Sequence, residues 1–226
     1  MQNLGSRVDF HTHTIHSDGA LLPGGLAYEA AARKHSVIAI TDHVDASNIE
    51  DAIPALIRFI IDQGDSLPLK IIPGAEISYL DPRLIEKFSL RARELGAKLI
   101  VVHGESPVEP VPKGTNHAAL KLKGLVDILA HPGWITEEDA ILAKVNNIYL
   151  ELSARKGHRK ANRHVAKMAM EFGAKLLIDT DAHSEKDLIT QQKAYEIAKE
   201  SGLKNEEAIR VIRDYPQELL KRIGYQ

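Results

Sequence analysis

The chain has 226 residues, 44% of them hydrophobic and 27% charged, which is a globular composition with room for a substantial buried core. Its formal net charge of −2 argues against a global basic field that would attract nucleic acid or an anionic membrane, and its lack of cysteine excludes disulfides and thiolate metal sites. The sequence has neither a secretory signal nor an apolar run of about 18 residues, so we expect a cytoplasmic protein without membrane contact, folded as a single domain over residues 1–226.

Short apolar runs rich in β-branched residues predict seven strands, and each run is followed by a stretch with helical spacing of its apolar residues. Strands of this kind that alternate with helices indicate a parallel sheet covered by helices. The segment 205–225 predicts a closing helix with a break before Pro216. The strand runs cover residues 7–11, 36–41, 69–76, 98–103, 126–131, 147–152 and 175–180.

Residues that can bind a metal ion follow almost every predicted strand. His11 and His13 stand two apart after the first strand, and an extended chain directs such a pair to the same side. Because all strand C-termini of a parallel βα barrel lie on one rim, the convergence of these residues favours a barrel over a doubly wound sheet. The sixth strand lacks an obvious ligand at its end but carries Glu151. The second strand ends at Asp42 and His43, the third at Glu76, the fourth at His103, the fifth at His131, and the seventh at Asp181 and His183.

Each of these residues has an alternative role without a metal. A single histidine at a strand end is more often a hydrogen-bonded structural residue, but so many together make metal binding the stronger interpretation. Asp18 in the sequence SDG suits a turn, yet its loop begins at the site, and we expect it to be a ligand. Asp42 is adjacent to His43 and faces the opposite side, so we expect it to accept a hydrogen bond that orients an imidazole. The role of His16 stays open. Three further histidines, His35, His117 and His164, are predicted to be structural, and His35 suits the C-terminal end of a helix.

The candidate ligands are too numerous for one ion. A tetrahedral or octahedral ion that also binds water and substrate cannot use them all, so two or three divalent ions fit better. Glu76, a lone carboxylate among imidazoles, is the natural bridge, and the ligand types suit zinc, manganese and iron alike. The candidates are His11, His13, Asp18, His43, Glu76, His103, His131, Asp181 and His183.

Six motifs occur here in the order and spacing of the polymerase and histidinol phosphatase (PHP) family: HTHTIHSDG, ITDH, PGAE, VVHGE, AHPG and DTDAH. The chain resembles that family along nearly its whole length. The resemblance implies a distorted (β/α)7 TIM-like barrel with a two- or three-metal site at the C-terminal rim of its parallel strands, held by the nine residues above. Some family members use a histidine in the loop that contains Asp18. Members hydrolyse histidinol phosphate, nucleotides or nucleic-acid ends, so the resemblance does not fix the substrate.

The expected reaction is hydrolysis of a small phosphomonoester: a histidinol-phosphate-like compound, a sugar phosphate or a nucleotide. Clustered divalent ions lower the pKa of water, and we expect a metal-bridging hydroxide to attack the phosphorus. His183 and Asp181 are expected to take part in catalysis, with His183 or His16 as the acid for the leaving oxygen. The sequence leaves the oligomeric state open.

Two loops are candidates for substrate contacts. The basic segment 153–164 follows the sixth strand, and we expect its Arg155 to contact phosphate, the alternative being a solvated basic helix start. The proline-rich segment 104–117 either is a plain rigid crossover or meets the rest of the substrate through Glu105, Glu109 and Lys113.

Three other functions share parts of this pattern. A nuclease or phosphodiesterase acting on nucleic-acid ends would use the same site but needs a basic, aromatic-lined groove, and only 5% of the residues are aromatic. A metal-dependent amidohydrolase also begins with His-x-His, although the carboxylate and imidazole positions after strands three to five suit a phosphoesterase better. A metal-stabilised binding domain without turnover is disfavoured because every expected ligand is present.

Overall fold

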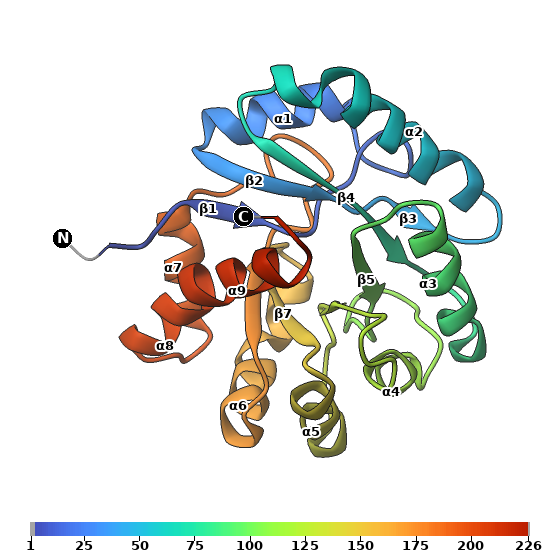
Figure 1. The fold of residues 1–226 in the computed structure, drawn as a ribbon. Coiled ribbons are helices and arrows are strands. Elements are labelled where there is room, and N and C mark those ends of the chain that lie inside the picture. Colours follow the sequence, from blue (N-terminus) through green and yellow to red (C-terminus); the bar gives the residue numbers. More distant parts are fainter. Residues whose placement is uncertain (1–2, 226) are drawn as a thin grey trace.

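The computed structural model describes residues 3–225, which form a nearly closed barrel of seven parallel strands with helices on its outside (Figure 1). The strands are hydrogen-bonded in the order β1-β2-β4-β5-β6-β7-β8, and a short extra strand, β3, pairs with β4. A parallel bridge between Thr12 and Ala182 joins the chain just beyond β1 to the chain just beyond β8. The strands are β1 (Arg7–Asp9), β2 (His35–Ile40), β3 (His43–Val44), β4 (Lys70–Ile77), β5 (Leu99–His103), β6 (Ile128–Ala130), β7 (Tyr149–Ser153) and β8 (Leu176–Asp179).

Helices connect the strands and cover the barrel. The α-helices are α1 (Pro23–Ala32), α2 (Ile49–Gln63), α3 (Ile85–Glu94), α4 (Thr115–Leu120), α5 (Glu137–Asn146), α6 (Asn162–Phe172), α7 (Gln191–Glu200), α8 (Asn205–Ile209) and α9 (Tyr215–Arg222). The shorter helical segments are the 3-10 turns η1 (Gly64–Ser66), η2 (Pro82–Leu84) and η3 (His158–Ala161) and the π-helical η4 (Arg210–Asp214). Within residues 3–225, no helix is both long enough and apolar enough to cross a bilayer.

The predicted barrel class is confirmed, and each of the seven main strands coincides with a predicted run, with β2, β4 and β7 extending one residue beyond theirs. One local expectation was wrong, since His35 begins β2 instead of ending a helix, and the short strand β3 was not predicted. The break before Pro216 is the π-helical turn η4, because proline has no N–H for the regular helical hydrogen bond.

Alternate residues of the strands serve two different cores. In β5, Leu99 and Val101 point into the barrel, where they join a cluster with residues such as Phe10 of the first strand segment. Ile100 and Val102 of the same strand belong to the outer cluster, against the helices. This two-residue period is the one expected for strands with both faces buried. The packed interior leaves the C-terminal rim as the place where polar side chains gather.

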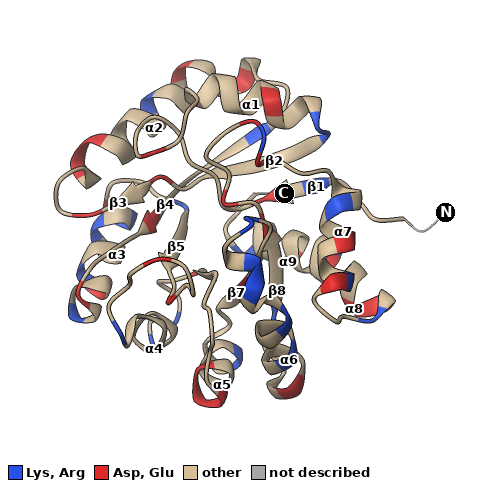
Figure 2. Ribbon diagram, turned by 180° about the vertical axis from the view of Figure 1, so that it is seen from behind, with Lys and Arg blue, Asp and Glu red and all other residues tan. Residues whose placement is uncertain are grey.

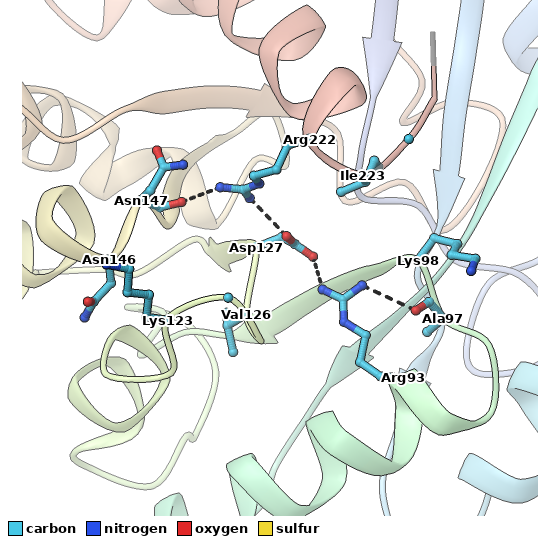
Figure 3. A pocket seen from close by; sticks show the side chains of 12 residues that line it. Arg93, Ala97, Lys98, Lys123, Val126, Asp127, Asn146, Asn147, Arg222 and Ile223 are labelled. Atoms are coloured by element: carbon cyan, nitrogen blue, oxygen red, sulfur yellow. Dashed lines mark hydrogen bonds and ion pairs between the residues drawn. The ribbon is translucent and has the colours of Figure 1, made fainter.

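The N-terminal end of the barrel is closed by α9 and by a charged network (Figure 3). Asp127, just before β6, pairs through one oxygen with Arg222 Nη2 at 3.0 Å and through the other with Arg93 Nη2 at 2.5 Å. These residues border a cavity of about 690 Å³. Because Arg93 also bonds to the Ala97 carbonyl and Arg222 to the Asn147 carbonyl, both guanidiniums are engaged in holding this end together. We interpret the network as structural.

Candidate metal centre

The nine candidate ligands come together at the C-terminal ends of the strands. The segment with His11 and His13 continues β1, and the backbone N–H of His13 donates to the Ala182 carbonyl at 2.8 Å. His43 opens β3 and stands in register with Glu76 of β4. Within the described residues, five overlapping sets of His, Asp and Glu side chains have donor atoms within 4.8 Å of one another.

The first group of donor atoms comprises His11, His13, Glu76 and Asp181, all buried. His11 Nε2 lies 3.2 Å from Glu76 Oε2 and 3.7 Å from Asp181 Oδ1. His13 Nε2 lies 3.6 Å from the same glutamate oxygen and 3.2 Å from the same aspartate oxygen. The donor atoms of His11, His13 and Glu76 all lie within 4.8 Å of one another, and Asp181 approaches the same two imidazoles from another side.

A second group uses the other oxygen of Glu76. Its Oε1 lies 3.1 Å from His103 Nδ1 and 3.7 Å from His131 Nε2. The rings of the two histidines meet edge to face with centroids 4.5 Å apart. Glu76 thus presents Oε2 to the first group and Oε1 to the second, as a bridging carboxylate would, and its Oε2 also lies 2.7 Å from His43 Nδ1.

The third group lies nearer the solvent. His183 Nε2 is 3.1 Å and His43 Nε2 is 3.8 Å from Asp18 Oδ1, and His13 Nδ1 is 4.0 Å from the same oxygen. The side chain of Asp18 is 57% exposed, whereas those of Glu76 and His13 are fully buried. The loop of Asp18 therefore folds back over the site from its open side.

Unpartnered buried atoms test whether these residues fit metal ions. Within residues 3–225, His11 Nε2, both ring nitrogens of His13 and of His131, and Glu76 Oε2 are buried without a hydrogen-bond partner. Buried polar atoms are normally paired, and imidazole and carboxylate are ligands of divalent ions. The residues present therefore fit the binding of divalent metal ions.

The backbone is strained where it carries three of the side chains at the site. His131, Asp181 and Tyr79 have φ angles of 26°, 52° and 55°, in the left-handed region that L-residues with a side chain rarely adopt. Such conformations cost on the order of 1–3 kcal/mol each and occur preferentially at functional sites. The strained backbone therefore directs these side chains toward the site at a cost in folding stability.

A second layer of side chains orients the imidazoles. Glu151 Oε2 lies 2.6 Å from His11 Nδ1, and Ser78 Oγ lies 2.7 Å from His43 Nδ1. The expected role of Asp42 differs: it accepts hydrogen bonds from Thr14 N, Thr14 Oγ1 and Ser17 Oγ, so it holds the loop between β1 and α1 instead of a ring. Its adjacency to His43 in the sequence predicts which way the Asp42 side chain points but not which groups it binds.

Electrostatics at the site act differently on the individual imidazoles. Burial lowers the pKa values of His11, His103 and His183, but nearby carboxylates outweigh it and raise them, that of His103 to about 9. Burial raises the pKa of Glu76, but His43, His11 and His103 outweigh it and bring that pKa well below its usual value. Burial lowers the pKa of His13 to about 4 and moves that of His131 in the same direction. Metal binding requires ionised carboxylates and neutral imidazoles, so an ion would displace protons from the imidazoles whose pKa is raised.

Two further residues at the centre, His158 and Glu109, were not expected as ligands. His158 Nε2 lies 3.4 Å from Asp181 Oδ2, and its ring stacks on that of His131 with centroids 4.1 Å apart. Glu109 Oε2 lies 3.0 Å from His103 Nε2. Glu109 comes from an irregular loop and His158 from the start of the short turn η3, and neither has a sequence periodicity that predicts the direction of its side chain. The lack of a ligand after the sixth strand was the one available signal for His158.

The remaining histidines and Arg155 occupy varied positions. Arg155 enters the site: its Nη1 contacts His183 Nδ1 and lies 3.2 Å from the Asp181 carbonyl. The imidazoles outside the candidate groups have other partners, namely His35 with the Ala30 carbonyl, His117 with Asp139 and His164 with the Ile135 carbonyl. The backbone N–H of His16 donates to Thr14 Oγ1.

Comparisons with known proteins agree on one family for this chain. The PHP domain family model matches residues 9–201. The chain is 43% identical over 224 residues to the uncharacterized protein MJ1295 of Methanocaldococcus jannaschii, covering 96% of this chain and 100% of that protein. It is 26% identical over 247 residues to a probable phosphatase of Thermoanaerobacter sp. strain X514, covering 96% and 97% of the two chains.

Solved structures extend the similarity in fold. A chain of archaeal ribonuclease P with mature tRNA superposes with a TM-score of 0.70 at 17% identity, over 96% of this chain and 91% of that one. Histidinol phosphate phosphatase of Lactococcus lactis, solved with zinc, L-histidinol and phosphate, gives 0.59 at 14% identity, over 98% and 95%. At these identities the likeness concerns the fold.

Proposed function

This chain belongs to the PHP domain family, and from that membership we propose that it is a metal-dependent phosphoesterase that hydrolyses a small-molecule phosphomonoester. Histidinol-phosphate-like compounds, sugar phosphates and nucleotides are the substrate classes we favour. The observation that carries the proposal is the position of Glu76, whose two oxygens face two different groups of buried imidazoles. A site of this kind suits the chemistry of phosphate esters better than a single-ion site does.

In this proposal two or three divalent ions, zinc, manganese or iron, are held by the nine residues of the three groups. Bound divalent ions supply a water of lowered pKa and offset the charge that develops on phosphoryl oxygens. The buried carboxylates of Glu76 and Asp181 stay ionised because the surrounding imidazoles bring their pKa values well below the usual range. Burial of His11 and His13 excludes bulk water from this side of the site.

Arg155 is proposed to bind the phosphate group. Its side chain is 35% exposed, and its Nη1 lies 3.6 Å from Asp181 Oδ1 and against His183. A planar guanidinium offers parallel donors to phosphate oxygens. A phosphate held there would lie against Asp181 and His183, which we therefore keep as the catalytic pair.

The open side of the site suits a compact substrate. A cavity of about 250 Å³ adjoins the third group, and it is lined by residues that include Asp18, His43, Asn48 and Tyr79. This volume is below the range of about 300–1,000 Å³ that is usual for drug-sized ligands. Hydroxyl and amide groups in the lining can bind a polar alcohol portion. These features favour a metabolite over a long polymer.

A nuclease or phosphodiesterase is the second candidate. Basic residues gather between β7 and the first turn of α6 (Figure 2). They are Lys156, Arg159, Lys160 and Arg163, which line a separate cavity of about 390 Å³. Such a surface would suit the backbone of a nucleic-acid end. A metal-stabilised binding domain without turnover is the third candidate.

Release of inorganic phosphate from a panel of esters tests the proposal. The panel contains histidinol phosphate, sugar phosphates, nucleotides and one phosphodiester, and the protein is loaded with zinc, manganese or iron. A His131→Ala variant removes a candidate ligand, and His164→Ala is the matched control because His164 bonds to the Ile135 carbonyl outside the groups. We expect release from one monoester that is lost only in His131→Ala. Cleavage of the diester alone would favour the nuclease, and silence across the panel with ions bound would favour the binding domain.

A further inference from the structure

We propose that His158 is an additional ligand of the metal centre, supplied by the loop after β7 and oriented by Ser106 of the loop after β5. The inference rests on the metal centre of the proposed function but not on its substrate. It concerns a side chain outside the nine candidates of the sequence motifs.

The position of His158 is that of a ligand. Its side chain is 2% exposed, and Nε2 lies 3.4 Å from Asp181 Oδ2. Asp181 Oδ1 faces His11 and His13, so the second oxygen of this carboxylate is the one that His158 approaches. Donor atoms of His131, His158 and Asp181 all lie within 4.8 Å of one another. Both ring nitrogens of His131 lack a hydrogen-bond partner among the described residues.

A contact from the opposite loop selects the ring nitrogen that can coordinate. His158 Nδ1 lies 2.7 Å from Ser106 Oγ, and Ser106 Oγ also accepts from the backbone N–H of Val108. When Nδ1–H donates to this hydroxyl, the lone pair of Nε2 faces the centre. Histidines that bind metals characteristically donate their other N–H in this way.

The two loops are packed closely enough to keep this contact. A Cβ added to Gly157 would lie 3.0 Å from Val108 Cγ2, so glycine is what allows the loops to approach. Glu109 continues from the same loop and places Oε1 3.7 Å from His158 Nε2. The imidazole is thus held from both sides, by Ser106 at Nδ1 and by carboxylates at Nε2.

The assignment also completes the pattern of the rim. Each of the other main strands delivers a candidate ligand at or just after its C-terminal end, whereas β7 offers Glu151 as a partner of His11. With His158, the loop that follows β7 also contributes. A ligand on a loop instead of a strand end explains why strand-end motifs do not include it.

Metal binding tests the assignment without any substrate. Metal-free protein is titrated with Co²⁺ and Zn²⁺, and the number of bound ions, their affinity and the visible Co²⁺ spectrum are recorded. We expect His158→Ala to weaken the affinity for one ion by at least about 10–100-fold, which is the loss seen when a residue that supports a metal ligand is removed. The variant should also alter the Co²⁺ spectrum. His164→Ala, on the neighbouring helix α6, should match the wild type. Unchanged stoichiometry, affinity and spectrum in a folded His158→Ala variant would overturn the proposal.

Ser106 variants keep the test decisive if His158→Ala does not fold. Ser106→Ala removes the acceptor of Nδ1–H and should alter the Co²⁺ spectrum, whereas Ser106→Thr keeps a hydroxyl and should restore it. If neither variant alters the spectrum, Ser106 does not orient a ligand and the proposal fails. A protein that binds ions as expected but releases no phosphate from any ester would refute the proposed function and leave this inference standing.

Discussion

Replacing Glu151 tests how the barrel wall controls the metal centre. Its carboxylate lies 2.6 Å from His11 Nδ1, and both side chains are fully buried. This contact keeps the proton of His11 on Nδ1, so that Nε2 is free to face Glu76 and Asp181. Glu151 touches no other candidate ligand through a hydrogen bond among the described residues. A variant at this position therefore changes the orientation and basicity of one imidazole.

The expected loss of metal affinity depends on which groups each variant leaves next to His11 Nδ1. Loss of a residue that supports a ligating histidine typically weakens metal binding 10–100-fold, or about 1.4–2.7 kcal/mol. Glu151→Gln keeps an oxygen that can accept from His11 Nδ1 and removes only the charge, so we expect about a tenfold loss. Glu151→Ala also leaves a buried N–H without a partner, so we expect a loss near about 100-fold.

Competition with a chromophoric chelator measures the affinity directly. Glu171→Gln is the control, because this glutamate is exposed on α6. The order expected is wild type equal to Glu171→Gln, then Glu151→Gln, then Glu151→Ala. If Glu151→Ala binds every ion as tightly as the wild type, the link from Glu151 to His11 has no role in the centre.

Three further predictions concern stability and proton linkage. Asp127→Ala breaks the pairs with Arg93 and Arg222; because these arginines are about one quarter exposed, we expect a loss of about 2 kcal/mol and a Tm lower by about 4–8 °C in calorimetry. Gly104→Ala would place a Cβ 2.2 Å from the Ala130 carbonyl oxygen, so we expect about 3 kcal/mol less stability in urea, and an unchanged midpoint would contradict this contact. Metal affinity should fall as pH drops from about 9, because protons compete for the imidazoles of raised pKa, His103, His11 and His183, and ions retained fully on dialysis at pH ~5 would refute imidazole ligation.

Much of the fold and the candidate ligand set could be predicted because strand ends in a parallel barrel obey a simple rule. Each strand run is apolar and short, and the residue after it lies on the rim whatever the intervening loop does. Glu76 illustrates this: its position at the end of β4 follows from the apolar run before it. His11 and His13 follow in the same way from their spacing of two.

What could not be predicted depends on loops and on pairing partners. Glu109 lies in an irregular segment and His158 opens the one-turn segment η3, and neither stretch is long enough for a two-residue or helical period to assign a direction. Asp42 was expected to orient an imidazole, but the turn of the HTHTIHSDG segment brings Thr14 and Ser17 to it first. The partner of a buried carboxylate is a property of the tertiary structure, which adjacency in sequence does not determine.

The closing seam of the barrel joins the fold to the candidate chemistry. Within residues 3–225, β1 and β8 share no ladder; the segments beyond them meet at a single bridge, and side chains supply further links, such as Asp179 accepting from Phe10 N at 2.7 Å. His13 lies on one side of this seam and Asp181 on the other, with donor atoms 3.2 Å apart. An ion held by both would cross-link the first and last strands, so its binding free energy would also contribute to closing the barrel. The side chains that are costly to bury without an ion thus lie at the seam that an ion would help to close.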